Sequence, residues 1–319
     1  MKLGVNTSPR PPFNSREAYR TVAQTAERLG FDFLSVSDHV VVPRENVSRY
    51  PYNEEGKLGA AMLGHCFDQL TTLAFLAGCT DRIRLLSSVM VVPHRPPVLT
   101  AKILATADVL SGGRIILGCG AGWLREEFEA LQTRPYDARG KVTDEYLEAF
   151  KQLWTNDNPA YAGEHVAFKD VVFQPKPLQK PHIPIWVGGE SGPAMRRAAS
   201  IGDGWYPGSS NPANRLDTVA RLSAGIAKVR DLAQTAGRDP SALDIAYVVQ
   251  WPVDWIAQRG SDGKRRFMTG SAADMAEDAA MLTTLGVGHV ALRLQAPSLA
   301  ATLERIQRFG EEVIPLVGR

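Results

Sequence analysis

The dipeptide Asp38-His39 offers the clearest chemistry in the chain. It closes a short apolar run, and an imidazole can donate or accept a proton at physiological pH. A nearby carboxylate raises the pKa of an imidazole and orients its ring. Adjacent side chains on a strand point to opposite faces, so the alternative is an aspartate that caps a loop beside a histidine bonded into the wall. We take Asp38 and His39 as the candidate catalytic pair.

Two glycine-rich segments follow other apolar runs. Gly118-Cys119-Gly120-Ala121-Gly122 lets the backbone approach a flat ring or a phosphate, because glycine has no side chain. It fits the dinucleotide-binding pattern badly, since no glycine opens a helix with an acid about 20 residues further on, and the alternative is a tight turn. Gly188-Gly189-Glu190-Ser191-Gly192-Pro193 precedes a predicted helix, whose free N–H groups and dipole favour a phosphate. Its alternative is plain helix capping.

Two further features allow either a functional or a purely structural interpretation. Lys264-Arg265-Arg266 lies in a long loop and could meet an anionic cofactor tail, or it is a solvated charge run. Trp251 and Trp255 could line a pocket, or they pack in the core.

Eight short apolar runs alternate with amphipathic stretches along the chain. Several runs are apolar on both faces, which is typical of parallel strands covered on both sides. Eight strands that alternate with helices match a (β/α)₈ TIM barrel, an α/β fold, rather than the five or six strands of an open doubly wound sheet. The predicted strands are Leu3–Asn6, Phe33–Ser37, Ile83–Val92, Ile115–Cys119, Ile185–Gly188, Gly204–Pro207, Ile245–Gln250 and His289–Leu294.

The predicted helices carry start and stop signals. Ser15 can cap the first helix and Gly30 can end it, while Pro96 and Pro97 suit the opening turn of another. Further helices are predicted at Val142–Trp154, Pro193–Ile201, Leu216–Ala236, Ala273–Leu285 and Leu299–Phe309.

Three segments exceed ordinary loop length, namely residues 40–66, 156–184 and 251–271. In a barrel they would be insertions at the C-terminal mouth, where long ordered loops act as lids or specificity loops. None resembles an interdomain linker, so we expect one domain over residues 1–319.

Barrel enzymes place their active sites at the C-terminal ends of the strands. This rule brings both glycine-rich segments and the Asp38-His39 pair to one mouth. The residues expected there also include Asn6 and Ser8, Val89 to His94, Gly118 to Trp123, Gly189 to Gly192, Gly208 and Ser209, Trp251 to Trp255, and Arg293 to Gln295.

Bulk composition excludes several classes of protein. The net charge of +2 over 319 residues is too small to indicate a nucleic-acid or membrane partner. The chain starts without a signal-peptide pattern and lacks a run of about 20 apolar residues. Its three cysteines have no CxxC spacing, so we expect no disulfide framework, no metal site and a cytoplasmic location.

A set of motifs in this order and spacing resembles the luciferase-like monooxygenase family, whose members are barrels that use flavin or deazaflavin. The matching motifs span most of the chain. They are Gly30-Phe31-Asp32, Ser37-Asp38-His39, Thr80-Asp81-Arg82-Ile83-Arg84-Leu85, Pro96-Pro97-Val98-Leu99-Thr100-Ala101-Lys102, Leu110-Ser111-Gly112-Gly113-Arg114, Gly118-Cys119-Gly120-Ala121-Gly122-Trp123, Pro184-Ile185-Trp186-Val187-Gly188-Gly189 and Gly202-Asp203-Gly204-Trp205.

The resemblance implies roles for particular residues. It implies a non-proline cis peptide at Ser88–Val89 that bulges against the central ring of the cofactor, and phosphate-side contacts from Gly189-Glu190-Ser191. It places Asp38-His39 at the reacting end of a deazaflavin, and it implies a homodimer. Gly120, Gly122, Trp123 and Gly188 complete the expected cofactor-binding set.

The stretch from Leu110 to Trp123, followed by Glu126-Glu127-Phe128, looks like oxidoreductases that use coenzyme F420. The resemblance thus implies hydride transfer between F420 and a small organic substrate. At Trp123 some such enzymes have a glutamate that transfers a proton, so that role is absent here or displaced to Glu126, and His39 must be the acid. The alternatives are an FMNH₂-dependent monooxygenase and a non-catalytic flavin-binding protein.

Overall fold

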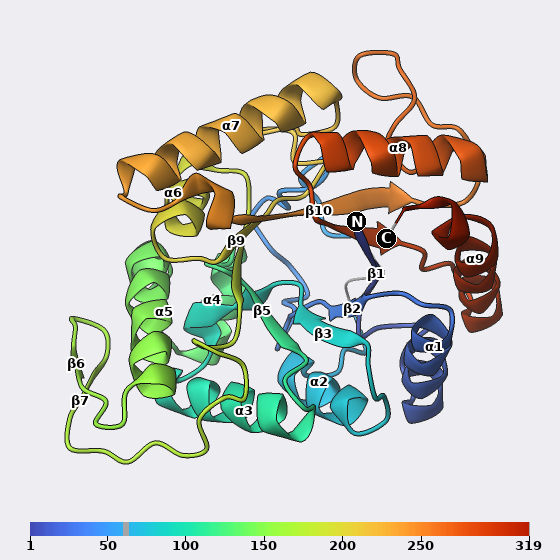
Figure 1. The fold of residues 1–319 in the computed structure, drawn as a ribbon. Helices are drawn as coiled ribbons and strands as arrows, with labels where there is room; N and C mark the ends of the chain where they lie inside the picture. Colours follow the sequence, from blue (N-terminus) through green and yellow to red (C-terminus); the bar gives the residue numbers. More distant parts are fainter. Residues whose placement is uncertain (60–63, 319) are drawn as a thin grey trace.

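The computed structural model describes residues 1–59 and 64–318, and within them the parallel strands close into a ring. The first strand pairs with the last, and β3 and β4 form one interrupted barrel strand, which gives eight in the part of the chain described. The expected TIM barrel is confirmed (Figure 1). The strands of the ring are β1 (Lys2–Thr7), β2 (Phe33–Val36), β3 (Arg84–Ser87), β4 (Met90–Val91), β5 (Ile115–Gly120), β8 (Ile185–Gly188), β9 (Gly204–Tyr206), β10 (Asp244–Pro252) and β11 (His289–Arg293).

Helices surround the ring of strands (Figure 1). They are α1 (Arg16–Arg28), α2 (Gln69–Ala77), α3 (Pro97–Leu110), α4 (Arg125–Leu131), α5 (Arg139–Thr155), α6 (Gly192–Ser200), α7 (Val219–Thr235), α8 (Ala272–Thr284) and α9 (Leu299–Glu312). Helices α2 and α4 are absent from the helices predicted from the sequence. The first has apolar residues on most sides and therefore no stripe, and the second spans only two turns.

The three long excursions differ in their placement. Residues 156–184 form a hairpin of β6 (Tyr161–Ala162) and β7 (Ala167–Phe168) beside α5, at the periphery of the helices and not over the mouth as expected (Figure 1). Residues 251–271 begin with the end of β10 and continue as a loop that closes on itself through the Arg259–Arg265 bridge. The excursion at 40–66 includes residues 60–63, which lie outside the described residues.

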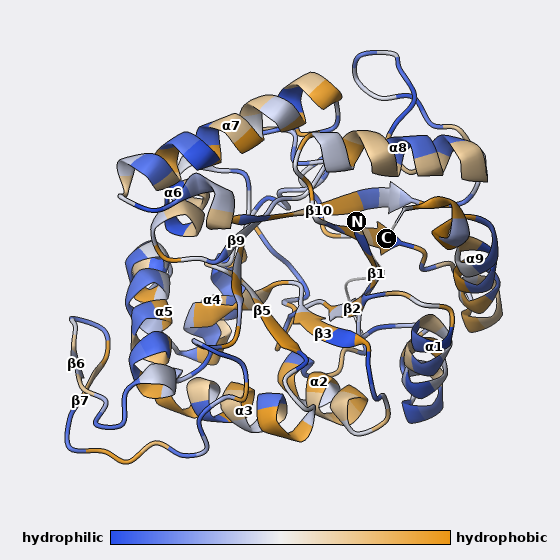
Figure 2. Ribbon diagram, viewed as in Figure 1, coloured by the Kyte–Doolittle hydropathy of each residue, from blue (hydrophilic) through white to orange (hydrophobic). Residues whose placement is uncertain are grey.

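Apolar side chains fill the barrel and the layer between strands and helices. The strands of the ring are largely hydrophobic, whereas the helices carry both hydrophobic and hydrophilic residues (Figure 2). This distribution matches a parallel sheet covered by amphipathic helices. The side chains inside the barrel are Phe33, Leu86, Ile116, Trp186, Tyr206, Ala246, Val248 and Ala291.

The third barrel strand is interrupted at the Ser88–Val89 peptide bond, which is cis, as the resemblance implied. The neighbouring strands make room for this interruption with glycine. A Cβ on Gly120 would lie 3.0 Å from Val89 Cγ2, and one on Gly188 would lie 2.8 Å from Val89 Cγ1. Deeper in the barrel, a Cβ on Gly118 would lie 2.0 Å from the carbonyl oxygen of Ser87. The glycines of β5 and β8 are therefore required by the close approach of the interrupted strand.

The Gly118→Ala substitution tests this requirement. The added methyl group must displace the backbone of β3, so we expect destabilisation of about 3 kcal/mol or more, at the upper end of overpacking effects. Gly288→Ala is the matched control, because the nearest atom to its Cβ would be 3.8 Å away. Urea unfolding of both variants measures the difference, and equal stability would contradict the requirement.

Candidate active site

The predicted site residues converge on one mouth of the barrel. Asp38 and His39 follow β2, the Ser88–Val89 bond interrupts the third barrel strand, and β2, β3, β5 and β8 are successive neighbours in the ring. The Ser88 hydroxyl lies 3.0 Å from the Tyr206 hydroxyl at the end of β9, which extends the group to a further strand. Burial raises the pKa of Tyr206 to about 12, so this hydroxyl stays protonated.

His39 is held by a carboxylate that the sequence analysis did not select. Its Nδ1 lies 2.8 Å from Oε2 of Glu127, and both side chains are buried. Burial raises the pKa of the Glu127 carboxyl, but the hydrogen bond from His39, the attraction of the two neighbouring histidine rings and the Val40 N–H together outweigh this, so the pKa lies below its ordinary value. An ionised carboxylate accepts a hydrogen bond from Nδ1–H, which leaves Nε2 as the nitrogen that can exchange a proton.

Asp38 does not contact the His39 ring through any recorded hydrogen bond or ion pair in the described part of the chain. The Arg95 guanidinium donates to both of its carboxylate oxygens, at 2.7 and 2.8 Å, and the Val91 N–H donates to Oδ2 at 2.9 Å. The expectation that Asp38 assists His39 is therefore wrong. Because successive side chains on an extended backbone point to opposite sides, one member of the pair meets Arg95 and the other meets Glu127.

A second histidine lies behind the carboxylate of Glu127. His94 Nδ1 is 4.0 Å from Glu127 Oε1, and the ring packs at 4.6 Å against that of Phe128. Neither ring nitrogen of His94 has a hydrogen-bond partner among the described residues. Burial lowers the pKa of His94 to about 4, since it outweighs the attraction of Glu127 and Asp38. Glu127 therefore faces a neutral ring on this side.

The loop after β5 and the first turn of α4 bring an aromatic ring and a second carboxylate to this region. Trp123 packs edge-to-face against His39, with ring centroids 6.3 Å apart. Among the described residues, Glu126 accepts hydrogen bonds from the N–H groups of Val47 and Ser48, and it forms no hydrogen bond or ion pair with His39. Burial raises the pKa of Glu126, but these hydrogen bonds lower it to about 2. The displaced-acid alternative at Glu126 is thus not supported, and the neighbouring Glu127 takes the place beside His39.

Glu190, the acidic residue of the segment after β8, forms its hydrogen bonds with other residues of the protein. Gly189 has a φ of 105°, and its carbonyl accepts a hydrogen bond from Trp205 Nε1 at 2.9 Å. Glu190 is buried and accepts from the Gly208 N–H and from Asn211, which ties the loop after β8 to the loop after β9. Burial raises the pKa of Glu190. Ser191 is exposed and caps α6, so a phosphate would meet this hydroxyl and the start of the helix rather than Glu190.

Some candidates from the sequence have structural roles instead. Trp251 is buried and donates to the carbonyl of Phe267, while Trp255 donates to Glu312 of α9. Arg265 pairs with Asp278 of α8 at 2.6 Å. The basic loop and the tryptophan pair are therefore not parts of the group around His39.

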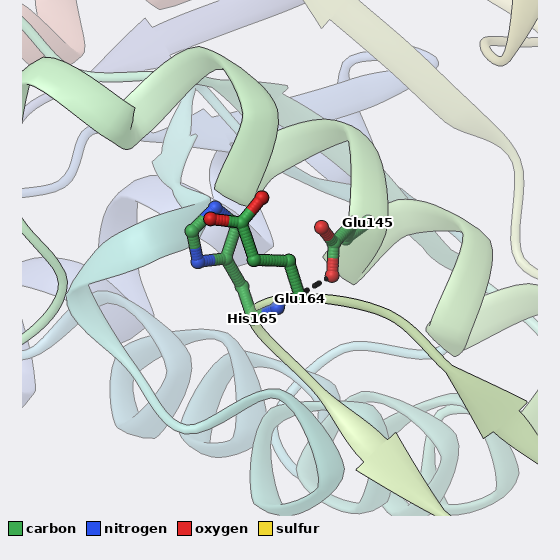
Figure 3. Close-up of side chains that lie close together, drawn as sticks. All are labelled: Glu145, Glu164 and His165. Atoms are coloured by element: carbon green, nitrogen blue, oxygen red, sulfur yellow. Dashed lines mark hydrogen bonds between the residues drawn. The ribbon is translucent and has the colours of Figure 1, made fainter.

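A separate cluster of metal-ligating residue types lies where the β6–β7 hairpin meets α5 (Figure 3). Possible ligand atoms of Glu145, Glu164 and His165 lie within 4.8 Å of one another. The Glu145 carboxylate accepts the backbone N–H of His165 at 2.8 Å, and Arg134 donates to the His165 carbonyl. These contacts explain the cluster as the anchor of the hairpin.

The buried neutral state of His94 predicts acid sensitivity. Its pKa is lowered from 6.5 to about 4, so between these pH values the unfolded chain binds a proton at this histidine and the folded chain does not. The free energy of unfolding therefore falls as pH falls through that interval. The full effect corresponds to about 3 kcal/mol. We expect His94→Phe to flatten the loss of unfolding free energy between pH 6.5 and 4.5, whereas the control His65→Gln, at an exposed histidine, keeps it. Urea titrations at several pH values give the comparison, and an unchanged slope in His94→Phe would refute it.

No helix in the described ranges 1–59 and 64–318 is long and apolar enough to cross a bilayer.

Comparison with known proteins identifies the class of the site. A family model described as luciferase-like monooxygenase matches residues 1–258. An uncharacterized protein of Mycobacterium tuberculosis is 33% identical over 247 residues, which cover 77% of this chain and 82% of that protein. An FMNH₂-dependent dimethylsulfone monooxygenase of Pseudomonas putida is 31% identical over 189 residues, which cover 59% of this chain and 47% of that enzyme.

The fold also matches solved structures over its whole length. The coenzyme F420-dependent tetrahydromethanopterin reductase of Methanopyrus kandleri superposes with a TM-score of 0.76 at 17% identity, over 99% of both chains. The closed barrel, the interrupted third strand and the matched residues lead to one conclusion. The chain belongs to the luciferase-like monooxygenase family and is an oxidoreductase of that family.

Proposed function

We propose that this protein transfers a hydride between coenzyme F420 and a small organic substrate, with His39 as the group that donates or accepts the accompanying proton. The observation that carries the proposal is the buried His39–Glu127 pair, 2.8 Å apart, at the same mouth as the Ser88–Val89 bulge. A buried, oriented imidazole beside an ionised carboxylate is suited to proton transfer. The same pair argues against a non-catalytic binding protein.

The residues present fit a flat tricyclic cofactor. The interrupted strand presents Val89 between the glycines of β5 and β8, so the surface under a ring is formed by one small side chain and by backbone. Ser191 and the start of α6 offer donors for a phosphate. The residues that would hold the cofactor are Asp38, His39, Ser88, Val89, Gly120, Gly122, Trp123, Gly188, Gly189, Glu190 and Ser191. Glu190 would act indirectly, because its carboxylate accepts hydrogen bonds from Gly208 and Asn211 and so holds the loop in place.

A bound F420 would supply or accept the hydride, whereas the chain positions the reactants and exchanges the proton. Nε2 of His39 donates or accepts the proton at the substrate, while the hydrogen bond to Glu127 fixes the orientation of the ring. Asp38 is a positioning residue. It holds the Val91 N–H, two residues beyond the cis bond, and is itself clamped by Arg95. Trp123 shields one edge of the imidazole from water.

A second candidate is an FMNH₂-dependent monooxygenase. It is favoured by the Pseudomonas putida relative, whose 31% identity exceeds that of the F420-dependent structure. Both candidates place the cofactor on the same bulge, so they differ in reaction and not in the position of the ring.

Titration of the apo-protein with each cofactor distinguishes the two candidates. We expect cofactor fluorescence to give a dissociation constant for F420 at least about tenfold below that for FMN, or about 1.4 kcal/mol tighter. Tighter binding of FMN would replace the leading candidate with the monooxygenase. Failure of the wild-type protein to bind either would refute the proposal itself.

Substitutions of the proton-transfer pair test their roles. We expect His39→Gln to lower turnover about 10²- to 10⁴-fold, the usual contribution of general acid–base catalysis. Glu127→Gln removes the carboxylate that orients the His39 ring, so we expect turnover to fall in this variant too, but by less than in His39→Gln. Asp68→Asn, which removes charge from the far side of Arg95, is the control. Turnover of His39→Gln at the wild-type rate would remove the proposed role.

A further inference from the structure

A segment of the chain crosses the mouth from one side of the barrel to the other. Residues 40–59, here called the strap, leave the end of β2 and reach the loop after β9. In the ring order β2 and β9 are four barrel strands apart in eight, so they lie opposite each other. The Ser210 hydroxyl donates to the Tyr52 carbonyl at 3.4 Å, and Arg215 forms an ion pair with Glu54. The strap therefore spans a diameter of the mouth.

The base of the strap is held firmly by α4. Glu127 accepts the N–H groups of Val40 and Val41 at 2.7 and 3.2 Å. Glu126 accepts those of Val47 and Ser48. Hydrogen bonds to ionised carboxylates are about twice as strong as neutral ones. Two consecutive glutamates thus fix four backbone amides of the strap.

The polar contacts that tie the tip of the strap to the loop after β9 are weak. The side chains of Glu54 and Arg215 are 70% and 34% exposed, and the Ser210 hydrogen bond is long. An exposed ion pair shifts an equilibrium by at most about fivefold. This asymmetry between base and tip is what a hinged element requires, because the tip can open while the base stays bound.

Aromatic side chains of the strap extend toward the site residues. Tyr50 packs edge-to-face against Trp123, with centroids 5.4 Å apart, and Trp123 packs against His39. Tyr50 also contacts Tyr52 at 5.8 Å. Burial, followed by the charge of Glu190 and the proximity of Tyr50 and Tyr206, raises the pKa of Tyr52. Tyr206 is hydrogen-bonded to Ser88, and Tyr52 lies near Tyr206. The two strap tyrosines therefore extend from Trp123, beside His39, toward the Ser88–Val89 bulge.

We propose that the strap is a lid that opens at its tip to admit the cofactor and closes over it through Glu54 and Arg215, with Tyr50 as the ligand-facing residue of the closed state. The inference rests on the proposed function, because it assigns the cofactor to the mouth beneath the strap. It adds an expected order of events, since a cofactor enclosed in this way leaves only after the tip has opened.

Stopped-flow release of the cofactor from the loaded protein tests the lid, using F420 or FMN, whichever binds tighter. We expect Glu54→Gln to increase the release rate about two- to fivefold and to remove its dependence on salt. The charge-swapped double variant Glu54→Arg, Arg215→Glu restores slow release. The control Glu17→Gln breaks an ion pair of similar exposure, 67% and 40%, on α1 and leaves release unchanged. Release that is equal in Glu54→Gln and wild type would overturn the lid.

A second pair of variants tests the assignment of Tyr50. We expect Tyr50→Phe, which keeps the aromatic contact with Trp123, to release the cofactor at nearly the wild-type rate. Tyr50→Leu loses this contact, and we expect release about five- to tenfold faster than in Tyr50→Phe. Equal release in both variants would remove Tyr50 from the proposal.

Hydrogen exchange separates failure of the lid from failure of the proposed function. In the apo-protein we expect amides of residues 50–56 to exchange faster than those of residues 40–48, and Glu54→Gln to accelerate only the former. Cofactor addition should then protect residues 50–56. If neither cofactor binds, the proposed function fails while the apo measurement still decides whether the tip opens. Uniform exchange along residues 40–56 would overturn the lid.

Discussion

The carboxylate of Glu127 organises the whole candidate site. One of its oxygens holds His39, and the other holds the two backbone amides that begin the strap. A buried carboxylate is costly unless hydrogen bonds satisfy it, and here three donors do so. The orientation of the proposed proton-transfer group and the path of the chain above it therefore depend on the same charge.

The surroundings of this carboxylate keep it available to His39. On its far side the ring of His94 is buried and neutral, so it does not compete as a cation. Asp38, the other acid nearby, is satisfied by Arg95 and the Val91 N–H. Glu127 thus holds the imidazole of His39, whereas Asp38 holds the backbone beyond the cis bond. Each carboxylate therefore has its own set of charge-assisted hydrogen bonds.

The barrel imposes a second constraint, on the strands next to the interruption. Gly118, Gly120 and Gly188 leave room for the backbone of β3 and for the side chain of Val89. Strand neighbours in a closed ring cannot move apart without breaking the ladder of hydrogen bonds. The absence of side chains at these positions is therefore what allows a bulge to project into the mouth, where a flat ring can rest on it.

The sequence alone determined the barrel, the strand termini that meet at the mouth and the glycine segments, because alternating apolar runs and turn residues express preferences between near neighbours in the chain. It also located His39 and, through family resemblance, the cis bond. Only the tertiary structure showed that Glu127 and not Asp38 holds His39, that Glu190 is turned inward, and that the strap reaches the loop after β9. His39 and Glu127 are 88 residues apart, and Tyr52 and Ser210 are 158 apart. No local pattern encodes such contacts, since they arise from the closure of the ring, which brings the C-terminal ends of strands far apart in the chain to one mouth.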